Sequence, residues 1–267
     1  ATGGYGRSEL SPYSDWDLLI LVPEKVDNKT KRIITKFTQL IWDVGGNLGH
    51  SVRSINDAKK FFNIDHHART AFLEARLLIG NGVLFNSLWS TENPQVWDIK
   101  KRKDFCQQKI EECFARHQKH GDTAFCMEPD CKNGKGGLRD VSTIFWLSMA
   151  WYQVPAARQL VSEGIVSPDE FKDFVKAREF LWRVRTALHL LSNRENDRLN
   201  FEYQLKISKQ FRFRENKTSG SVERFLKKYF LNVRTIANLS DIFLLHFQEL
   251  ISPLSGVDNQ RRLPFGL

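Results

Sequence analysis

Segments with the composition of β-strands are confined to the first hundred residues of this 267-residue chain. Residues 15–22 form an apolar, leucine-rich run, and residues 48–55 alternate apolar and polar side chains. Between them, residues 30–44 repeat apolar side chains at the helical period. Residues 66–79 also have a helical pattern, whereas the apolar stretch at 83–85 fits either a further strand or the start of a helix. This order predicts an α/β unit.

From about residue 100 onward, the apolar residues follow the helical period and no strand pattern occurs. Ser167, Pro168 and Glu170 form the start signal of one helix, with a capping serine and a glutamate three residues after it. The helices that we expect in this part lie at residues 100–119, 138–152, 168–192, 198–210 and 221–250. The fold class predicted for the whole chain is therefore α+β.

The composition is typical of a soluble globular protein, with 41% hydrophobic and 27% charged residues. The longest apolar runs are too short to cross a bilayer, so we expect no membrane association. Of the net charge of +9, the first hundred residues carry +1 and the remainder +8, which suits a polyanion or a nucleotide in a cleft. The basic residues are scattered and not interleaved with exposed aromatic ones, so nucleic acid is not the expected partner.

Four cysteines lie close together, at positions 106, 113, 126 and 131, with two histidines between the second and the third. Zinc ligands normally come in compact pairs, and no C-x-x-C pair is present, so we expect no zinc. The chain opens without a secretory signal and without methionine. We therefore expect free, reduced thiols in a cytoplasmic protein, and a chain that is part of a longer one.

The opening stretch GGYGRSELSPYSDWDLLILV combines a glycine pair with two acids one residue apart. Successive strand residues point to opposite faces, so Asp15 and Asp17 are predicted to share a face. Two neighbouring carboxylates repel each other, and a magnesium ion with oxygen ligands removes that cost. The backbone N–H groups of Gly3 and Gly4 can approach phosphate oxygens closely because these residues carry no side chain.

Arg7 and Ser14 lie within the same stretch and are predicted to belong to the phosphate-binding group, the arginine by neutralising phosphate and the serine by capping or hydrogen-bonding locally. Taken together, these residues predict Mg²⁺ and a nucleoside triphosphate held for metal-assisted nucleotidyl transfer. The alternative from the residues alone is a surface turn followed by a half-buried strand that carries two acids by chance.

A second glycine-rich loop, KNGKGGLRD at residues 132–140, precedes one of the predicted helices. Basic side chains beside three glycines at a helix start suit an anion. We predict that Lys132 and Arg139 contact nucleotide phosphates. The alternative is a glycine-rich linker in which Asp140 only balances the helix dipole.

These motifs resemble those of the polymerase-β-type nucleotidyltransferases, whose signature is a glycine pair followed by Asp-x-Asp on a strand. More narrowly, the chain resembles the PII uridylyltransferase/uridylyl-removing family of bacterial nitrogen regulation. The stretches that carry this resemblance are GGYGRSELSPYSDWDLL (3–19), LGHSVRS (48–54), TAFLEARLLIG (70–80), GDTAFCMEPDCKNGKGGLRDVSTIFWL (121–147) and RENDRLNFEYQLKIS…VERFLKKYF (194–230).

The resemblance implies a Mg²⁺-dependent enzyme that transfers UMP from UTP to a tyrosine hydroxyl of the PII signal protein. Gly3 and Gly4 then match the phosphate-binding pair, and Asp15 and Asp17 match the metal ligands. Members of this family normally continue with a phosphohydrolase domain of the HD type, which removes UMP, and two glutamine-sensing ACT domains. We expect this chain to be the transferase portion only.

The expected organisation follows from the pattern and the resemblance together. The parts are a nucleotidyltransferase α/β domain at 1–98, a helix and glycine-rich loop completing the nucleotide cleft at 99–137, a helical bundle domain at 138–252 and a loosely ordered tail at 253–267.

Two departures from the family pattern leave questions open. Ser8 stands where the family usually has glycine, a change that is neutral if the backbone there is ordinary. Many polymerase-β-type enzymes use a third acid, but the candidate strand positions here hold His50 and Ser51. The remaining candidates for a third acid are Glu74, Glu128 and Asp140, unless it is absent. The open alternatives for function are a different nucleotidyltransferase, such as an adenylyltransferase, and a non-catalytic nucleotide- or nucleic-acid-binding module of the same fold.

Overall fold

Two parallel strands form the base of the N-terminal part. The computed structural model describes residues 1–153, 158–215 and 219–251. Among these residues, β1 (Trp16–Leu21) and β2 (Leu48–Arg53) pair in parallel, with Trp16 opposite Leu48, and α2 (Asn28–Asp43) connects them. The strand–helix–strand prediction is confirmed, with bounds shifted by one or two residues.

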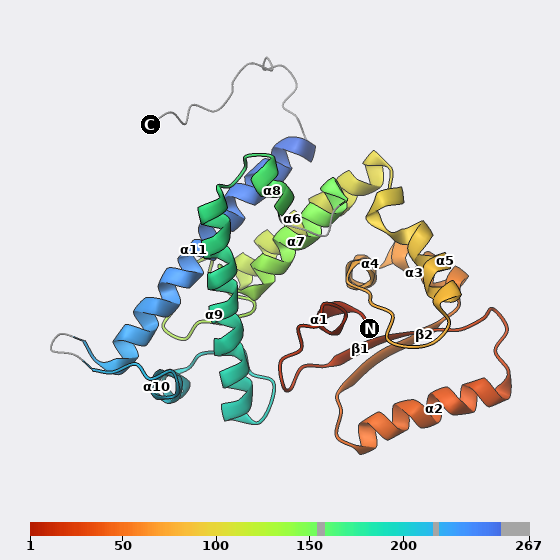
Figure 1. Cartoon of the computed structure of the whole chain (residues 1–267), viewed down its shortest axis with the longest axis horizontal. Helices are drawn as coiled ribbons and strands as arrows, with labels where there is room; N and C mark the ends of the chain where they lie inside the picture. The colour runs from red at the N-terminus through yellow and green to blue at the C-terminus, as the bar shows by residue number, and fades with distance from the viewer. Residues whose placement is uncertain (154–157, 216–218, 252–267) are drawn as a thin grey trace, which may run out of the picture.

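Helices lie on both sides of this small sheet. α2 is on one side, and α3 (Ile55–Ile64), α4 (His66–Leu73) and α5 (Gly82–Glu92) are on the other (Figure 1). An apolar cluster of the second group consists of Ala58, Phe62, Phe72 and Leu88, and Leu19 and Leu21 of β1 pack against it. The sheet is therefore held to α3–α5 by a small apolar core of its own.

The structure differs from the sequence prediction at two points in this part. The apolar pattern does not predict α3, although Ser54 caps it by accepting a hydrogen bond from the Asp57 N–H at 3.2 Å. The helix expected at 66–79 ends at Leu73, because the following residues pair with the N-terminus instead. Arg76 N–H donates to the Ala1 carbonyl, and the Ala1 amino group donates to the Arg76 carbonyl, both at 2.9 Å. Of the two alternatives left open for residues 83–85, the structure shows the start of a helix, since this stretch belongs to α5.

The rest of the described chain is helical, so the fold class is α+β as predicted. Its helices are η1 (Pro94–Val96), α6 (Ile99–Lys119), α7 (Leu138–Tyr152), α8 (Arg158–Ser162), α9 (Pro168–Ser192), α10 (Phe201–Gln210) and α11 (Ser221–Ile251). The helices predicted from the sequence are confirmed to within three residues at each end, and the pattern misses only η1 and α8. α9 begins at the predicted capping box, in which Ser167 Oγ accepts from the Glu170 N–H at 3.2 Å.

The larger apolar core lies among the long helices. α9 and α11 run side by side, and α6 and α7 pack against them (Figure 1). Fully buried side chains of this core include Phe105, Leu147, Leu181, Phe225 and Phe247. No helix of the described residues is long and apolar enough to cross a membrane. The tail predicted at 253–267 lies outside the described residues, and the domain boundaries at 98 and 137 remain a prediction.

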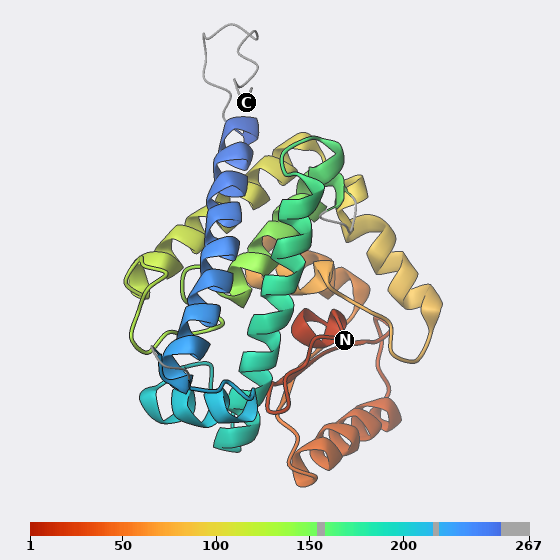
Figure 2. The same ribbon diagram turned by 60° about the vertical axis from the view of Figure 1, so that its left-hand side comes forward.

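The beginning of the chain lies against the helical part. The short helix α1 (Gly3–Gly6) packs against β1 and α4, and the loop after it runs toward α9 (Figure 1, Figure 2). The loop that follows α1 contacts α9 directly, since Tyr13 N–H donates to His189 Nδ1 at 3.3 Å and Arg178 lies 3.1 Å from Glu9. The residues of the opening motif therefore lie between the sheet and the long helices.

Candidate active site

Two glycines make room for the carboxylate of Asp17. Gly3 has a φ of +55°, and a Cβ added to it would lie 2.9 Å from Asp17 Oδ2. Gly49 is opposite Asp17 on β2, and a Cβ added there would lie 2.8 Å from Oδ1. The Thr2 N–H also donates to the Asp17 carbonyl at 3.0 Å. A side chain at either glycine would therefore displace the carboxylate that these two residues now flank.

Asp15 and Asp17 repel each other at the start of β1. Burial raises the pKa of Asp17, the neighbouring Asp15 carboxylate raises it further, and Lys132 opposes the shift. Asp15 comes directly before β1, and both acidic residues remain accessible to solvent. Both side chains offer oxygen, the ligand atom that Mg²⁺ prefers, and a cation held between them would relieve the repulsion. The donor set of this pair therefore fits a magnesium ion.

One cavity of about 640 Å³ is lined by every residue that the sequence assigns to metal or phosphate. Those residues are Gly3, Gly4, Arg7, Ser14, Asp15, Asp17, Lys132 and Arg139. They belong to α1 and the loop after it, to the start of β1, to the glycine-rich loop and to the first turn of α7. The fold thus brings two motifs that are far apart in the sequence into the wall of the same cavity.

Among the described residues, Arg139 is the cation of this cavity without an acidic partner. Its guanidinium lies over the Trp146 ring, 5.7 Å from the ring centre, and no described carboxylate is within ion-pair distance of it. Burial and the neighbouring Arg7 and Arg116 guanidinium groups lower its pKa, but an arginine stays charged at neutral pH. A half-buried guanidinium of this kind is well suited to bind a phosphate or carboxylate of a ligand.

Lys132, by contrast, is already paired. Its Nζ lies 3.0 Å from the Glu195 carboxylate and 3.4 Å from that of Asp197. A phosphate that contacts Lys132 must therefore compete with Glu195 and Asp197 for its charge.

Among the three candidate third acids, Glu74 lines the cavity and the other two do not. The Glu74 carboxylate accepts hydrogen bonds from the Arg7 guanidinium and from the Trp146 indole N–H. Burial raises its pKa, and these two donors oppose the shift. In this arrangement Glu74 holds Arg7 on the cavity wall.

Glu128 and Asp140 are engaged elsewhere. Glu128 pairs with Arg198 at 2.9 Å. Asp140 is fully buried at the start of α7, where it accepts from the Arg116 guanidinium at 2.6 Å and from the Gly136 N–H at 2.7 Å. These contacts make Asp140 a structural group that stabilises the glycine-rich loop.

The four cysteines are free thiols, and three of them are buried. Cys113 joins His117 and Asp140 in a group of metal-ligating side chains whose ligand atoms lie within 4.8 Å of one another. The Arg116 guanidinium lies 3.2 Å from Cys113 Sγ, and burial raises the pKa of this thiol to about 12. A protonated thiol beside a guanidinium is a poor cation ligand, so we interpret this group as a hydrogen-bonded network.

Comparison with known proteins identifies the family. A family model described as GlnD PII-uridylyltransferase matches residues 104–244, which is more than half of the chain. The chain belongs to this family. The match covers the glycine-rich loop with Lys132 and Arg139, whereas the opening motif lies before it.

Relatives of this GlnD-family chain cover nearly its whole length. Bifunctional uridylyltransferase/uridylyl-removing enzymes are 39% identical over 91% of the chain in Azospirillum brasilense, 36% over 91% in Ruegeria pomeroyi and 38% over 96% in Rhodospirillum rubrum. The aligned region is 26%, 27% and 28% of the respective enzymes. The chain thus spans about a quarter of the length of these relatives.

Residues of α9 that the sequence motifs do not predict also line the cavity of this GlnD-family chain. Arg178, Trp182 and Arg185 line it from that helix, and Lys109 lines it from α6. A signal for Arg185 is present in the sequence, since it stands one turn before His189 and between the apolar residues Leu181 and Leu188 on the same helix face. Polar residues in such positions normally have specific partners, because burying them without a hydrogen bond is costly.

Proposed function

We propose that this chain transfers UMP from UTP to a tyrosine hydroxyl of the PII signal protein, with Mg²⁺ held by Asp15 and Asp17. The observation that carries the proposal is the cavity in which this acid pair meets the cations of both glycine-rich stretches. Membership of the GlnD PII-uridylyltransferase family supports UTP as the donor and PII as the acceptor. The polymerase-β-type nucleotidyltransferase fold is part of the same proposal.

The cavity residues have distinct tasks in this reaction. Arg139 binds the triphosphate of UTP through its guanidinium. Gly3 and Gly4 carry no side chains, so the phosphates can approach the protein backbone at these residues. Mg²⁺, when bound to Asp15 and Asp17, supplies charge neutralisation at the phosphates and activates the acceptor oxygen. A bond forms between the tyrosine oxygen and the α-phosphorus of UTP. The bond from the α-phosphorus to the oxygen that bridges it to the β-phosphorus breaks, and pyrophosphate leaves with the electron pair. The phenolic proton is released.

The acid pair provides the direct test. In Asp15→Asn and Asp17→Asn, Mg²⁺-dependent incorporation of labelled UMP into PII should fall by about 100-fold or more, because loss of a metal ligand removes several kcal/mol of transition-state stabilisation. Asp43→Asn is the matched control, since Asp43 is exposed at the end of α2 and outside the cavity. Full activity in the double variant of Asp15 and Asp17 would exclude the proposal.

The same assay separates the alternatives. Labelled ATP, CTP and GTP are offered in place of UTP, and preferential transfer from ATP would indicate an adenylyltransferase. Salt-sensitive RNA binding without transfer of any nucleotide would indicate a nucleic-acid-binding module.

A further inference from the structure

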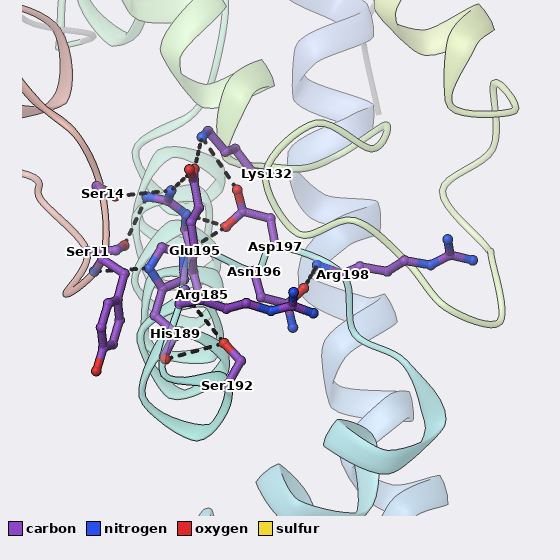
Figure 3. Close-up of polar contacts among 12 residues, drawn as sticks. Ser11, Ser14, Lys132, Arg185, His189, Ser192, Glu195, Asn196, Asp197 and Arg198 are labelled. Atoms are coloured by element: carbon purple, nitrogen blue, oxygen red, sulfur yellow. Dashed lines mark hydrogen bonds and ion pairs between the residues drawn. The ribbon is translucent and has the colours of Figure 1, made fainter. Parts of the chain in front are cut away.

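Arg185 on α9 joins the loop before Asp15 to the loop after α9 (Figure 3). Its Nη1 donates to Ser11 Oγ at 2.9 Å, and its Nη2 donates to Ser14 Oγ at 3.3 Å. Its Nε donates to Asp197 Oδ1 at 2.6 Å. A planar guanidinium can make all these bonds at once because its N–H groups point outward in a rigid fork. Arg185 is only 6% exposed, so water competes little for these bonds.

His189, one turn further along α9, connects the same two loops. The Tyr13 N–H donates to its Nδ1 at 3.3 Å, so Nδ1 is the unprotonated nitrogen. Its Nε2 then carries the proton and donates to Asp197 Oδ1 at 3.2 Å. Although Asp197 is largely buried, the bonds from His189 and Arg185 hold its pKa well below the ordinary value. Asp197 is therefore a charged acceptor that orients both side chains of α9.

Asp197 also reaches the second glycine-rich stretch. The Cys131 N–H donates to the Asp197 carbonyl at 2.8 Å, and the adjacent Lys132 Nζ lies 3.4 Å from the Asp197 carboxylate. Figure 3 shows Lys132 and Arg185 on either side of Glu195 and Asp197. The two segments that carry the predicted phosphate and metal groups are thus fastened to the same residue.

We propose that Arg185 is a positioning residue for the chemistry of the cavity. It holds residues 11–14 at a fixed distance from Asp197, and so sets where Asp15 and Asp17 lie relative to Lys132. The inference rests on the proposed function, because a bound metal and triphosphate require this spacing. Ser14 is followed directly by Asp15, so no flexible residue separates the Arg185 contact from the first carboxylate. Arg185 acts through protein groups, since its three donor nitrogens already face Ser11, Ser14 and Asp197.

The first experiment measures how well the loop before Asp15 is held in place, in the absence of any ligand. Amide hydrogen exchange of residues 8–17 is followed by mass spectrometry in the 267-residue chain and in Arg185→Met. We expect faster exchange of the Tyr13 and Ser14 amides in the variant, because the loop loses its anchors on α9. Lys176→Met is the control on the same helix, since Lys176 is exposed and pairs only with nearby Asp173 at 2.8 Å. Unchanged exchange in Arg185→Met would overturn the proposal.

The second experiment measures the affinity for Mn²⁺, which depends on the placement of Asp15 and Asp17. Mn²⁺ binding in the presence of UTP is determined by electron paramagnetic resonance of the free ion. In Arg185→Met, the Mn²⁺ dissociation constant should rise about tenfold, the lower end of the effect seen when a group supporting metal ligands is removed. Lys176→Met should bind as the parent chain does.

Two milder variants separate positioning from stability. Arg185→Lys keeps a charge opposite Asp197 but has no fork for Ser11 and Ser14, so it should restore the melting temperature more than the Mn²⁺ affinity. Ser11→Ala removes a single bond from the other end and should weaken Mn²⁺ binding without loss of fold. These two variants decide the matter if Arg185→Met does not fold. Mn²⁺ affinity that follows the melting temperature in every variant, or does not change in any, would show a purely structural role.

The parent chain tests the proposed function separately. If it binds Mn²⁺ with UTP but transfers no nucleotide, the proposed reaction is wrong, while the comparison among the Arg185 variants still holds. If the parent transfers UMP and Arg185→Met does so at the parent's rate per folded molecule, the positioning role is wrong and the proposed function stands.

Discussion

At the scale of single residues, the environment of the Asp17 carboxylate is defined by two glycines and by the lack of hydrogen-bond donors in the part of the chain that the structure describes. The described residues provide no hydrogen bond to its carboxylate, and the space it occupies exists because Gly3 and Gly49 lack side chains. Its raised pKa, caused by burial and then by Asp15, indicates that the free site is electrostatically unfavourable. Such a site gains stability when a cation binds, which is the property that a metal-binding pair needs.

Gly49→Ala should therefore weaken metal binding while leaving the fold intact. The new Cβ would lie 2.8 Å from Asp17 Oδ1, so the carboxylate must move away from its present position. We expect the Mn²⁺ dissociation constant in the presence of UTP to rise by about tenfold. Gly82→Ala is the control, because a Cβ there would meet only Leu77, at an ordinary 3.9 Å. Equal affinities in the two variants would contradict this account of Asp17.

Ser8 provides a second prediction at this scale. The expectation of a neutral change depends on an ordinary backbone, but Ser8 has a φ of +61°, in the left-handed region that favours glycine. Ser8→Gly should raise the free energy of unfolding by about 0.5–1 kcal/mol. The substitution relieves the strain of the left-handed backbone, but part of this gain is lost because glycine has a greater conformational entropy in the unfolded chain. Urea unfolding measures it, and Ser8→Ala, which keeps the strain, should show no gain.

At the scale of elements, α3 shows how a local start signal works without a strong apolar pattern. Ser54 Oγ accepts from the Asp57 N–H, and its hydroxyl also donates to the Asp57 carboxylate at 3.0 Å. The helix buries Ala58 and Phe62 against the small core beside the sheet. The cap and these two side chains together place the helix, because a short helix is marginal alone.

Ser54→Ala should destabilise the chain by about 1 kcal/mol, the usual cost of removing a capping hydroxyl. The free energy of unfolding in urea provides the measurement. Ser90→Ala is a matched control, since Ser90 is exposed within α5 and its hydroxyl donates only to the Ser87 carbonyl. A loss of stability in Ser90→Ala as large as that in Ser54→Ala would show that capping is not the cause.

At the scale of the whole molecule, Asp197 links segments that the chain order separates widely. It contacts Arg185 and His189 of α9 and reaches Lys132 in the glycine-rich loop, and through Arg185 and His189 it holds the loop before β1. A charged group with these partners makes the packing of the N-terminal part on the helices dependent on pH.

Asp197→Asn tests this dependence. Because the pKa of Asp197 is lowered in the folded chain, its contribution is complete above the unfolded pKa of about 3.9 and is lost as the pH falls toward the folded value. At pH 7 the variant should be less stable by about 3 kcal/mol, and the difference should shrink below about pH 4. Urea unfolding across this pH range measures it. Asp173→Asn, at an exposed ion pair, should show a much smaller difference, and a pH-independent gap for Asp197→Asn would contradict the prediction.

Much of this organisation could be predicted from the sequence because it depends on neighbours along the chain. The period of apolar residues locates α2 and the long helices, and a capping box marks the start of α9 at Ser167. The same local chemistry singles out Asp15, Asp17 and the glycine-rich loop with Arg139, which then line one cavity.

Only the tertiary structure decided which distant residues complete that cavity. Nothing in the local sequence distinguishes Glu74 from Glu128 or Asp140. Of these three acids Glu74 lines the cavity, because α4 and α7 bring it to Arg7 and Trp146. The role of Arg185 depends on the loops that fold against α9 from both sides. The sequence by itself determined most of the elements and the chemistry of the two motifs. Packing determined their mutual position, because burial and charge pairing act between residues that are close only in the folded chain.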